Sequence, residues 1–180
     1  MARFVALLRG INVGGKHLIK MPALKAAFEG DGFENVSTYI QSGNVLFDTS
    51  GRGGAALADR IEAMLESTFE IPLVVVVRSR AQLRAVVDRA PEGFGSAPGR
   101  YLYDVVFLKE PLTAKTAIKS LSMKEGVDEA YSATGVLYLR RLSAKAVQSR
   151  LNRIASLPIY KNMTIRNWNT TTKLLQLLES

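Results

Sequence analysis

The sequence predicts an α+β protein that is built from two similar halves. Each half shows the same order of segments: a strand, a helix, two strands, a helix and a strand, followed by a further helix. The middle strands of both halves flank turn residues and have similar sequences, TYIQSGNVLF at 38–47 and AYSATGVLYL at 130–139. This order is the split β-α-β pattern of ferredoxin-like folds. We therefore expect two ferredoxin-like repeats that are packed against each other or intertwined.

Short apolar runs and helical spacing of apolar residues locate the elements of the first half. Pro22 suits the first turn of a helix, and Gly30 and Gly32 end it. The strands expected here are residues 4–8, 36–41, 45–48 and 73–77, and the helices are 22–28, 57–65 and 82–87.

The second half repeats this order. Pro111 and Thr113 introduce its first helix, and Thr134 and Gly135 form its hairpin turn. The strands expected are residues 104–108, 129–131, 136–139 and 163–166, and the helices are 113–121, 147–154 and 170–178. We expect Asn169 or Thr170 to serve as the N-cap of the last helix.

Proline and glycine residues between the halves indicate a linker. Five of them occur between 91 and 99. The predicted division is a first subdomain at 1–90, a linker at 91–100 and a second subdomain at 101–180.

The composition excludes several kinds of site. The chain of 180 residues has 47% hydrophobic residues, which is typical of a globular protein. Because it has no cysteine and a single histidine, His17, it can form no disulfide, thiolate or multi-histidine metal site. A carboxylate-only site for a hard cation stays open, and no metal or cofactor is predicted.

The positive charge is concentrated in the second half. The net charge is +8, and residues 91–180 hold 13 basic against 7 acidic residues. No acid occurs between Ala130 and Leu178. This bias favours an anionic partner, such as a phosphorylated molecule or nucleic acid. A basic face that only serves solubility is the alternative.

No apolar run is long enough for a membrane helix, which needs about 18 residues. The apolar start of the chain ends at Arg9 and Gly10, before it could serve as a secretory signal. We therefore expect a soluble cytoplasmic protein without membrane contact, and a monomer as the default state.

The loop at 10–17 has the spacing of a phosphate-binding loop, with a glycine, four residues, and then Gly15 and Lys16. His17 occupies the position of the magnesium-binding hydroxyl, and Pro22 delays the helix. A true nucleotide triphosphatase is therefore disfavoured, and a looser anion-binding loop is expected. A flexible connector whose glycines permit positive φ is the alternative.

Two further segments combine hydrogen-bonding side chains. Residues 41–44 form the first hairpin tip. A hairpin turn explains Gly43 and Asn44 but does not require Gln41 or Ser42, which add hydrogen-bond donors and acceptors. Residues 166–170, with one arginine, two asparagines and the only tryptophan, could bind an anion or stack on a base. A hairpin turn and a core tryptophan are the respective alternatives.

The sequence shows no catalytic constellation. No serine neighbours His17, and Asp48 and Asp104 are interpreted as turn formers. Aromatic residues on the central strands, Phe4, Phe47 and Phe107, are too sparse to indicate an RNA-binding module. The catalytic residues are unknown.

Three segments, 7–16, 39–45 and 166–170, closely resemble the signatures of the domain of unknown function 1697 family. The resemblance spans nearly the full length and implies a bacterial-type cytosolic protein with two related α/β subdomains. It implies no established activity, substrate or cofactor. The hallmark positions that it implies are Arg9, Asn12, Gly14, Gly15, Lys16, Gln41, Ser42, Gly43, Asn44, Arg166, Asn167, Trp168 and Asn169.

The leading hypothesis is that these positions, apart from Gly43, bind a nucleotide, a phosphorylated small molecule or a nucleic acid at polar loops between the subdomains. The second is an enzyme acting on a phosphorylated small molecule, with Arg9, Lys16 and Arg166 stabilising charge. The third is a purely structural role that locks the subdomains together. Loop 10–16 and tip 41–44 follow parallel strands of one unit and so lie at the same end of its sheet.

Overall fold

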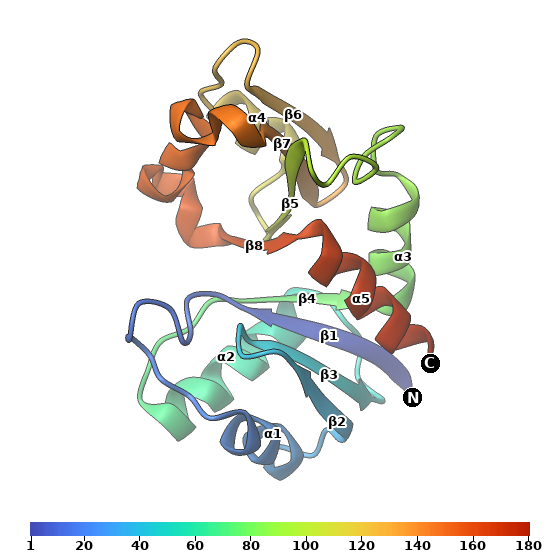
Figure 1. The fold of residues 1–180 in the computed structure, drawn as a ribbon. Coiled ribbons are helices and arrows are strands. Elements are labelled where there is room, and N and C mark those ends of the chain that lie inside the picture. Colours follow the sequence, from blue (N-terminus) through green and yellow to red (C-terminus); the bar gives the residue numbers. More distant parts are fainter. The chain divides into compact units, whose positions relative to one another are not determined.

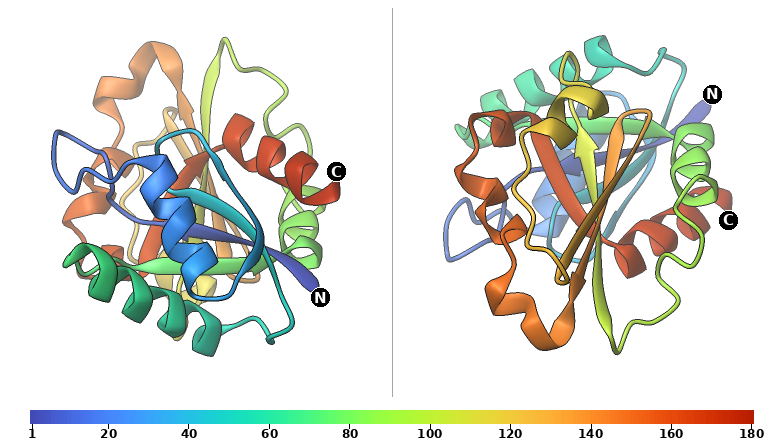
Figure 2. Two further views of the ribbon diagram at one scale, coloured as in Figure 1. Left: turned by 90° about the horizontal axis from the view of Figure 1, so that it is seen from below. Right: turned by 90° about the horizontal axis from the view of Figure 1, so that it is seen from above.

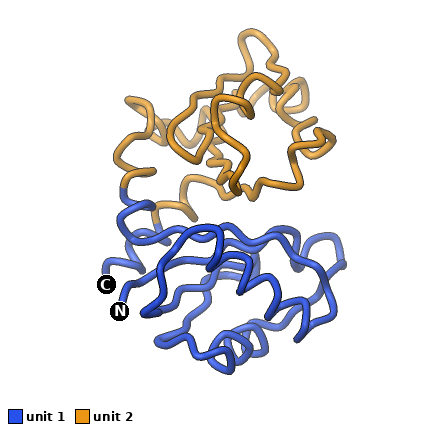
Figure 3. Tube along the Cα trace, turned by 180° about the vertical axis from the view of Figure 1, so that it is seen from behind, with its two compact units in different colours: residues 1–84, 173–180 blue, residues 85–172 orange.

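The computed structural model describes residues 1–180 and has two four-stranded antiparallel sheets, each with its own helices (Figure 1). The predicted α+β class is confirmed. The chain forms two compact units, residues 1–84 with 173–180 (unit 1) and residues 85–172 (unit 2) (Figure 3). None of the helices combines the length and apolar character that crossing a membrane requires.

Unit 1 contains the first sheet, in the order β2-β3-β1-β4. Each strand overlaps a predicted one: β1 (Ala2–Leu8), β2 (Glu34–Tyr39), β3 (Asn44–Thr49) and β4 (Val75–Ser79). Its helices are α1 (Met21–Gly30) and α2 (Ala55–Phe69), and α3 (Arg80–Asp88) begins in this unit.

Helices α1 and α2 cover one face of this sheet (Figures 1 and 2). Because side chains alternate along a strand, Phe4, Ala6 and Leu8 of β1 all point to that face. They pack in one buried cluster with Phe28 of α1 and Ile61 of α2. This packing fixes the end of β1 from which the first signature loop leaves.

Unit 2 contains the second sheet, in the order β6-β7-β5-β8. Its strands are β5 (Tyr101–Leu108), β6 (Asp128–Ala133), β7 (Val136–Leu142) and β8 (Met163–Asn167). Helix α4 (Ala114–Lys119) and the 3₁₀ helices η1 (Ser143–Gln148), η2 (Leu151–Ser156) and η3 (Pro158–Asn162) complete it, and α5 (Trp168–Glu179) begins in it.

The helix predicted at 147–154 is wrong, because this stretch is divided between η1 and η2. The backbone is extended at Ser149, with φ −61° and ψ 133°. The carboxylate of Asp128 accepts hydrogen bonds from the Ser149 hydroxyl at 2.6 Å and the Arg150 amide at 2.9 Å. These groups therefore do not continue a helical ladder.

The register of β5 leaves part of this strand without a neighbour on one side. Strand β7 pairs with Tyr101–Phe107, whereas β8 pairs only with Asp104–Leu108. The chain turns into α5 after Asn167. On the β8 side of β5, no strand therefore lies beside Tyr101, Leu102 and Tyr103.

The compact units do not coincide with the two halves of the sequence. Residues 91–100 group with unit 2, and Lys173–Ser180 group with unit 1. The chain thus passes between the units within α3 and again within α5. The predicted boundaries of the two repeats stay a prediction.

Candidate ligand-binding site

Asn12 organises the first signature loop in unit 1. Its amide nitrogen donates to the carbonyl oxygens of Ile19 at 3.0 Å and Gln41 at 2.8 Å. Its amide oxygen accepts from the Ile19 backbone N–H at 2.8 Å. One side chain therefore closes the loop after β1 and joins it to the hairpin tip, so the two segments meet within the unit.

Gly43 and Asn44 stabilise the hairpin tip through contacts with β1 and within the hairpin. The Leu8 N–H donates to the Gly43 carbonyl at 2.8 Å, and a Cβ on Gly43 would lie 2.8 Å from the Cβ of Leu8. Gly43 also has a φ of 82°. Asn44 is fully buried and donates to the carbonyl of Tyr39 and the hydroxyl of Ser42. Gly43 thus joins the hairpin tip to the end of β1, and Asn44 donates hydrogen bonds within the hairpin.

The glycine-rich loop differs from a phosphate-binding loop. The amides of Asn12 and Lys16 donate to the carbonyls of His17 and Val13, both at 3.1 Å. Gly14 and Gly15 adopt positive φ and, like Lys16, are exposed. Helix α1 begins at Met21, well after Lys16. The loop is a small closed turn whose amides at these two positions bond within it.

The last signature segment lies in unit 2, at the end of β8. Arg166 is 7% exposed, and it donates to the Thr164 hydroxyl at 2.8 Å and the Ile165 carbonyl at 2.9 Å. Burial lowers the pKa of its guanidinium to about 10. The Asn167 side chain accepts from the Thr170 amide at 2.8 Å. Asn167 therefore caps α5, and the predicted cap at Asn169 or Thr170 is wrong.

Trp168 is half-buried and belongs to an aromatic cluster. Phe94 meets it edge-on, with ring centroids 5.1 Å apart, and also contacts Tyr103 at 4.8 Å. Gly95 lies against the indole, since a Cβ there would come within 2.2 Å of Nε1. Its φ of 85° also favours glycine. The segment predicted as a linker thus packs against the tryptophan.

A pocket of about 320 Å³ opens beside Trp168, where β5 lacks a neighbouring strand. We call it the Trp168 pocket. It brings together three predicted site residues with side chains from β5, β7 and the preceding loop. Its lining is Gly95, Pro98, Tyr101, Leu102, Tyr103, Asp104, Arg141, Asn167, Trp168 and Asn169.

An ion pair lies in the wall of the Trp168 pocket. Arg141 donates to the Asp104 carboxylate at 3.1 Å and to the side-chain oxygen of Asn152 at 2.8 Å. Burial raises the pKa of Asp104, and Arg141 offsets this only in part. Asp104 is therefore an ion-pair partner within a strand, and its interpretation as a turn former is wrong. Asp48 likewise lies within β3, where it pairs with Arg3 at 3.0 Å.

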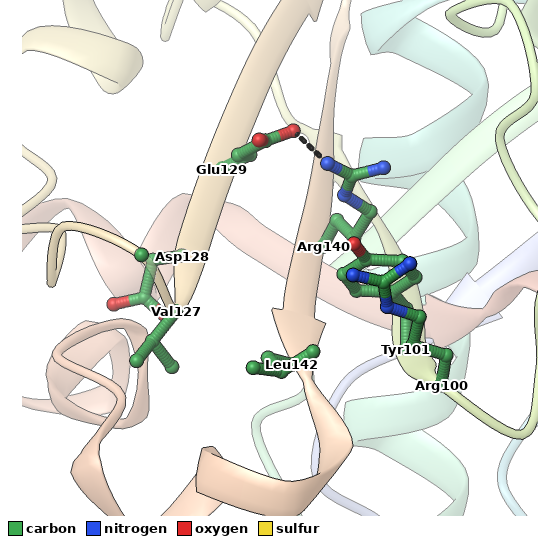
Figure 4. Close-up of a pocket in the computed structure, with 8 residues that line it drawn as sticks. Arg100, Tyr101, Val127, Asp128, Glu129, Arg140 and Leu142 are labelled. Carbon is green, nitrogen blue, oxygen red and sulfur yellow. Dashed lines mark hydrogen bonds and ion pairs between the residues drawn. The ribbon is translucent and has the colours of Figure 1, made fainter.

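A second, smaller pocket of about 120 Å³ shares Tyr101 with the first (Figure 4). Arg140 of β7 lies over the Tyr101 ring, 4.1 Å from its centroid, and pairs with Glu129 of β6. The remaining lining residues are Arg100, Gly126, Val127, Asp128 and Leu142.

Sequence reasoning missed most of these residues, because they become neighbours only through strand register. Asp104 pairs with Leu139 in the ladder, and Tyr101 pairs with Leu142. Alternating positions of β5 and β7 gave no signal of these contacts. The one available sign was the adjacent pair Arg140 and Arg141, which directly follows the strand predicted at 136–139.

The family model described as "Protein of unknown function (DUF1697)" matches residues 1–138. The chain belongs to this family. Membership in the DUF1697 family confirms the relationship that the signature segments predicted, although the match ends before the segment 166–170. The description of this family states no activity.

A solved structure of the conserved bacterial protein SP0830 from Streptococcus pneumoniae has a similar fold. Its TM-score is 0.83 at 26% sequence identity, and the similarity covers 98% of each chain. No curated protein sequence matches this chain.

Proposed function

We propose that this protein binds a nucleotide, or another anionic ligand with a planar ring, in the Trp168 pocket. The observation that carries the proposal is the setting of the only tryptophan. Trp168 is partly exposed in a pocket that also holds two asparagines, a carboxylate and an arginine. Pockets with aromatic walls and a few convergent polar groups are typical of small-molecule sites.

The aromatic wall supports stacking of a flat ligand. Contacts with Phe94 and Gly95 hold the indole in place, so little side-chain freedom would be lost on binding. Stacking of a base on an aromatic side chain contributes about 1–3 kcal/mol. A ligand without a ring would forgo this contribution.

The polar groups can read the edge of a base. The Asp104 carboxylate can accept from an exocyclic amino group, and the exposed amides of Asn167 and Asn169 can donate and accept. Arg141 is already held by Asp104 and Asn152, so its orientation is set before a ligand arrives. Unit 2 has 13 basic and 7 acidic residues, and this net charge of +6 would attract phosphate groups.

Intrinsic fluorescence tests the proposal, because every tryptophan signal comes from Trp168. Titration with AMP, GMP, CMP and UMP should quench the emission to saturation, with at least one of them binding below about 1 mM. Ribose 5-phosphate, which lacks a base, should quench little. Free N-acetyltryptophanamide corrects for light absorption by the nucleotides.

Two variants locate the site. Trp168→Ala should abolish nucleotide binding in calorimetry, whereas Arg153→Ala, an exposed arginine outside the pocket, should leave it unchanged. The proposal would be refuted if no nucleotide quenched the Trp168 emission to saturation and all of them were as inactive as ribose 5-phosphate.

We further propose a structural role for the signature residues of unit 1. Asn12 donates and accepts side-chain hydrogen bonds that close the loop, Asn44 donates two within the hairpin, and Gly43 permits close contact with Leu8. This pattern supports bracing of the loop that leaves β1. Substitution of Asn12 should then lower the stability of the protein.

We also propose that the two sheets are ferredoxin-like repeats. The support is that β2-β3-β1-β4 and β6-β7-β5-β8 have corresponding strand orders and antiparallel pairings.

We also propose that the protein is cytoplasmic, as the sequence analysis expects. Cell fractionation tests this location.

A further inference from the structure

One face of the second sheet carries partly exposed tyrosine and arginine side chains across three strands. Residues directly opposite in a ladder share a face, and so do alternate residues of one strand. The pairs Glu129–Arg140 and Tyr103–Arg140 place β6, β7 and β5 side chains on one face. We call the outer part of this face, together with Arg100 of the turn before β5, the tyrosine–arginine band. It consists of Arg100, Tyr101, Glu129, Tyr131 and Arg140.

Contacts among its members hold the band in place. The Arg140 and Arg100 guanidinium carbons lie 4.1 Å and 5.2 Å from the Tyr101 ring centroid. Glu129 accepts from Arg140 and, at 2.6 Å, from the Tyr131 hydroxyl. Figure 4 shows Arg140 reaching Glu129, with Tyr101 and Arg100 close by. Tyr131 keeps 39% of its surface exposed.

We infer that single-stranded nucleic acid binds along this band. Bases stack on aromatic and guanidinium planes of open sheet faces, and arginines contact the phosphates between them. The band holds two arginines against one carboxylate, and unit 2 as a whole has a net charge of +6. The sequence argument against an RNA-binding module considered only Phe4, Phe47 and Phe107, which are buried. In contrast, Tyr101 and Tyr131 are not buried.

The band adjoins the Trp168 pocket through a shared residue. Tyr101 lines both that pocket and the smaller pocket formed by Arg100 and Arg140. Tyr101 also lies in the part of β5 that pairs with β7 on one side and has no strand on the β8 side. When one base of a single-stranded nucleic acid occupies the Trp168 pocket, the neighbouring nucleotides would therefore contact the band. This inference rests on the proposed function and narrows its ligand to a strand of several nucleotides.

Fluorescence anisotropy with a fluorescein-labelled 12-mer of cytidylate, whose bases carry an exocyclic amino group, tests the inference at 50 mM salt. The 12-mer should bind at least about tenfold more tightly than CMP. Arg100→Ala should weaken its binding roughly tenfold and lower the salt slope, whereas Arg153→Ala removes an equal charge outside the band and should change it less than about twofold. Tyr131→Ala should weaken binding about tenfold, and Tyr131→Phe, which keeps the ring, should not.

The outcomes separate the two proposals. If CMP quenches Trp168 but the 12-mer binds no more tightly, or if Arg100→Ala and Arg153→Ala behave alike, the band is overturned and the proposed function stands. If the band variants weaken 12-mer binding while no mononucleotide binds, the proposed function fails and the band stands alone.

Discussion

At the scale of single residues, Gly95 determines how Trp168 is presented. The indole Nε1 occupies the space that a side chain at Gly95 would need, and the positive φ there adds strain for any other residue. The position of the candidate stacking surface therefore depends on a glycine in a loop.

Gly95→Ala should displace Trp168 and lower the free energy of unfolding by about 1–3 kcal/mol, because it adds both a clash and strain. Urea unfolding and the wavelength of tryptophan emission measure both effects. Gly99→Ala is the matched control, since a Cβ there meets nothing within 4 Å. Equal behaviour of the two variants would contradict this account.

Asp128 is a second residue on which local structure depends. Burial raises its pKa, but hydrogen bonds from the Ser149 hydroxyl and the Lys124 and Arg150 amides lower it more, so the net pKa is below the ordinary value of 3.8. The carboxylate thus stabilises the fold above that pH, and this contribution is lost as pH falls through the lowered pKa.

Asp128→Asn should therefore reduce the free energy of unfolding at pH 7. The difference in this free energy between the variant and wild type should be smaller below about pH 4. Chemical unfolding at pH 7 and pH 3 measures the two gaps. Asp48 and Glu129 also have lowered pKa values, so the comparison must be with the wild-type curve. A gap that stays constant with pH would contradict the role of the charged form.

At the scale of elements, the loop after β1 is held by side-chain hydrogen bonds. Asn12 bonds to both backbone groups of Ile19 and to the carbonyl of Gln41, whereas the exposed Gln41 takes part through its main chain. The two hallmark residues therefore differ in what their side chains contribute to this loop.

Asn12→Ala should lower the free energy of unfolding by about 2–4 kcal/mol, because it leaves several polar groups without partners and places alanine at a φ of 55°. Gln41→Ala should change it by less than about 0.5 kcal/mol. Thermal and urea unfolding measure both. A larger effect at Gln41 than at Asn12 would argue against the structural role.

At the scale of the whole molecule, charge is distributed unequally between the units. Unit 2 has a net charge of +6 out of the total of +8. The chain nevertheless passes between the units twice, within α3 and within α5, so binding measurements should use the full-length protein.

Binding of the cytidylate 12-mer should weaken steeply with salt. The logarithm of the binding constant should fall with the logarithm of salt concentration, by a slope of about 0.7 for each phosphate contacted. Titrations between 50 and 200 mM salt measure this slope. A binding constant independent of salt would show that the basic unit does not contact phosphates.

The sequence by itself determined the α+β class, the eight strands and the prominence of segment 166–169, because apolar periodicity and turn residues are local properties. It also located the first loop and hairpin tip at one end of a sheet. The sequence did not predict the 3₁₀ helices after β7, because they depend on hydrogen bonds that the Asp128 carboxylate accepts from Ser149 and Arg150, which lie far along the chain.

Only the tertiary structure decided which side chains surround Trp168. The pairing of Asp104 with Arg141, the stacking of Arg140 on Tyr101 and the fit of Gly95 against the indole all depend on strand register and loop packing. Such contacts join residues that are distant in sequence, so no local pattern encodes them.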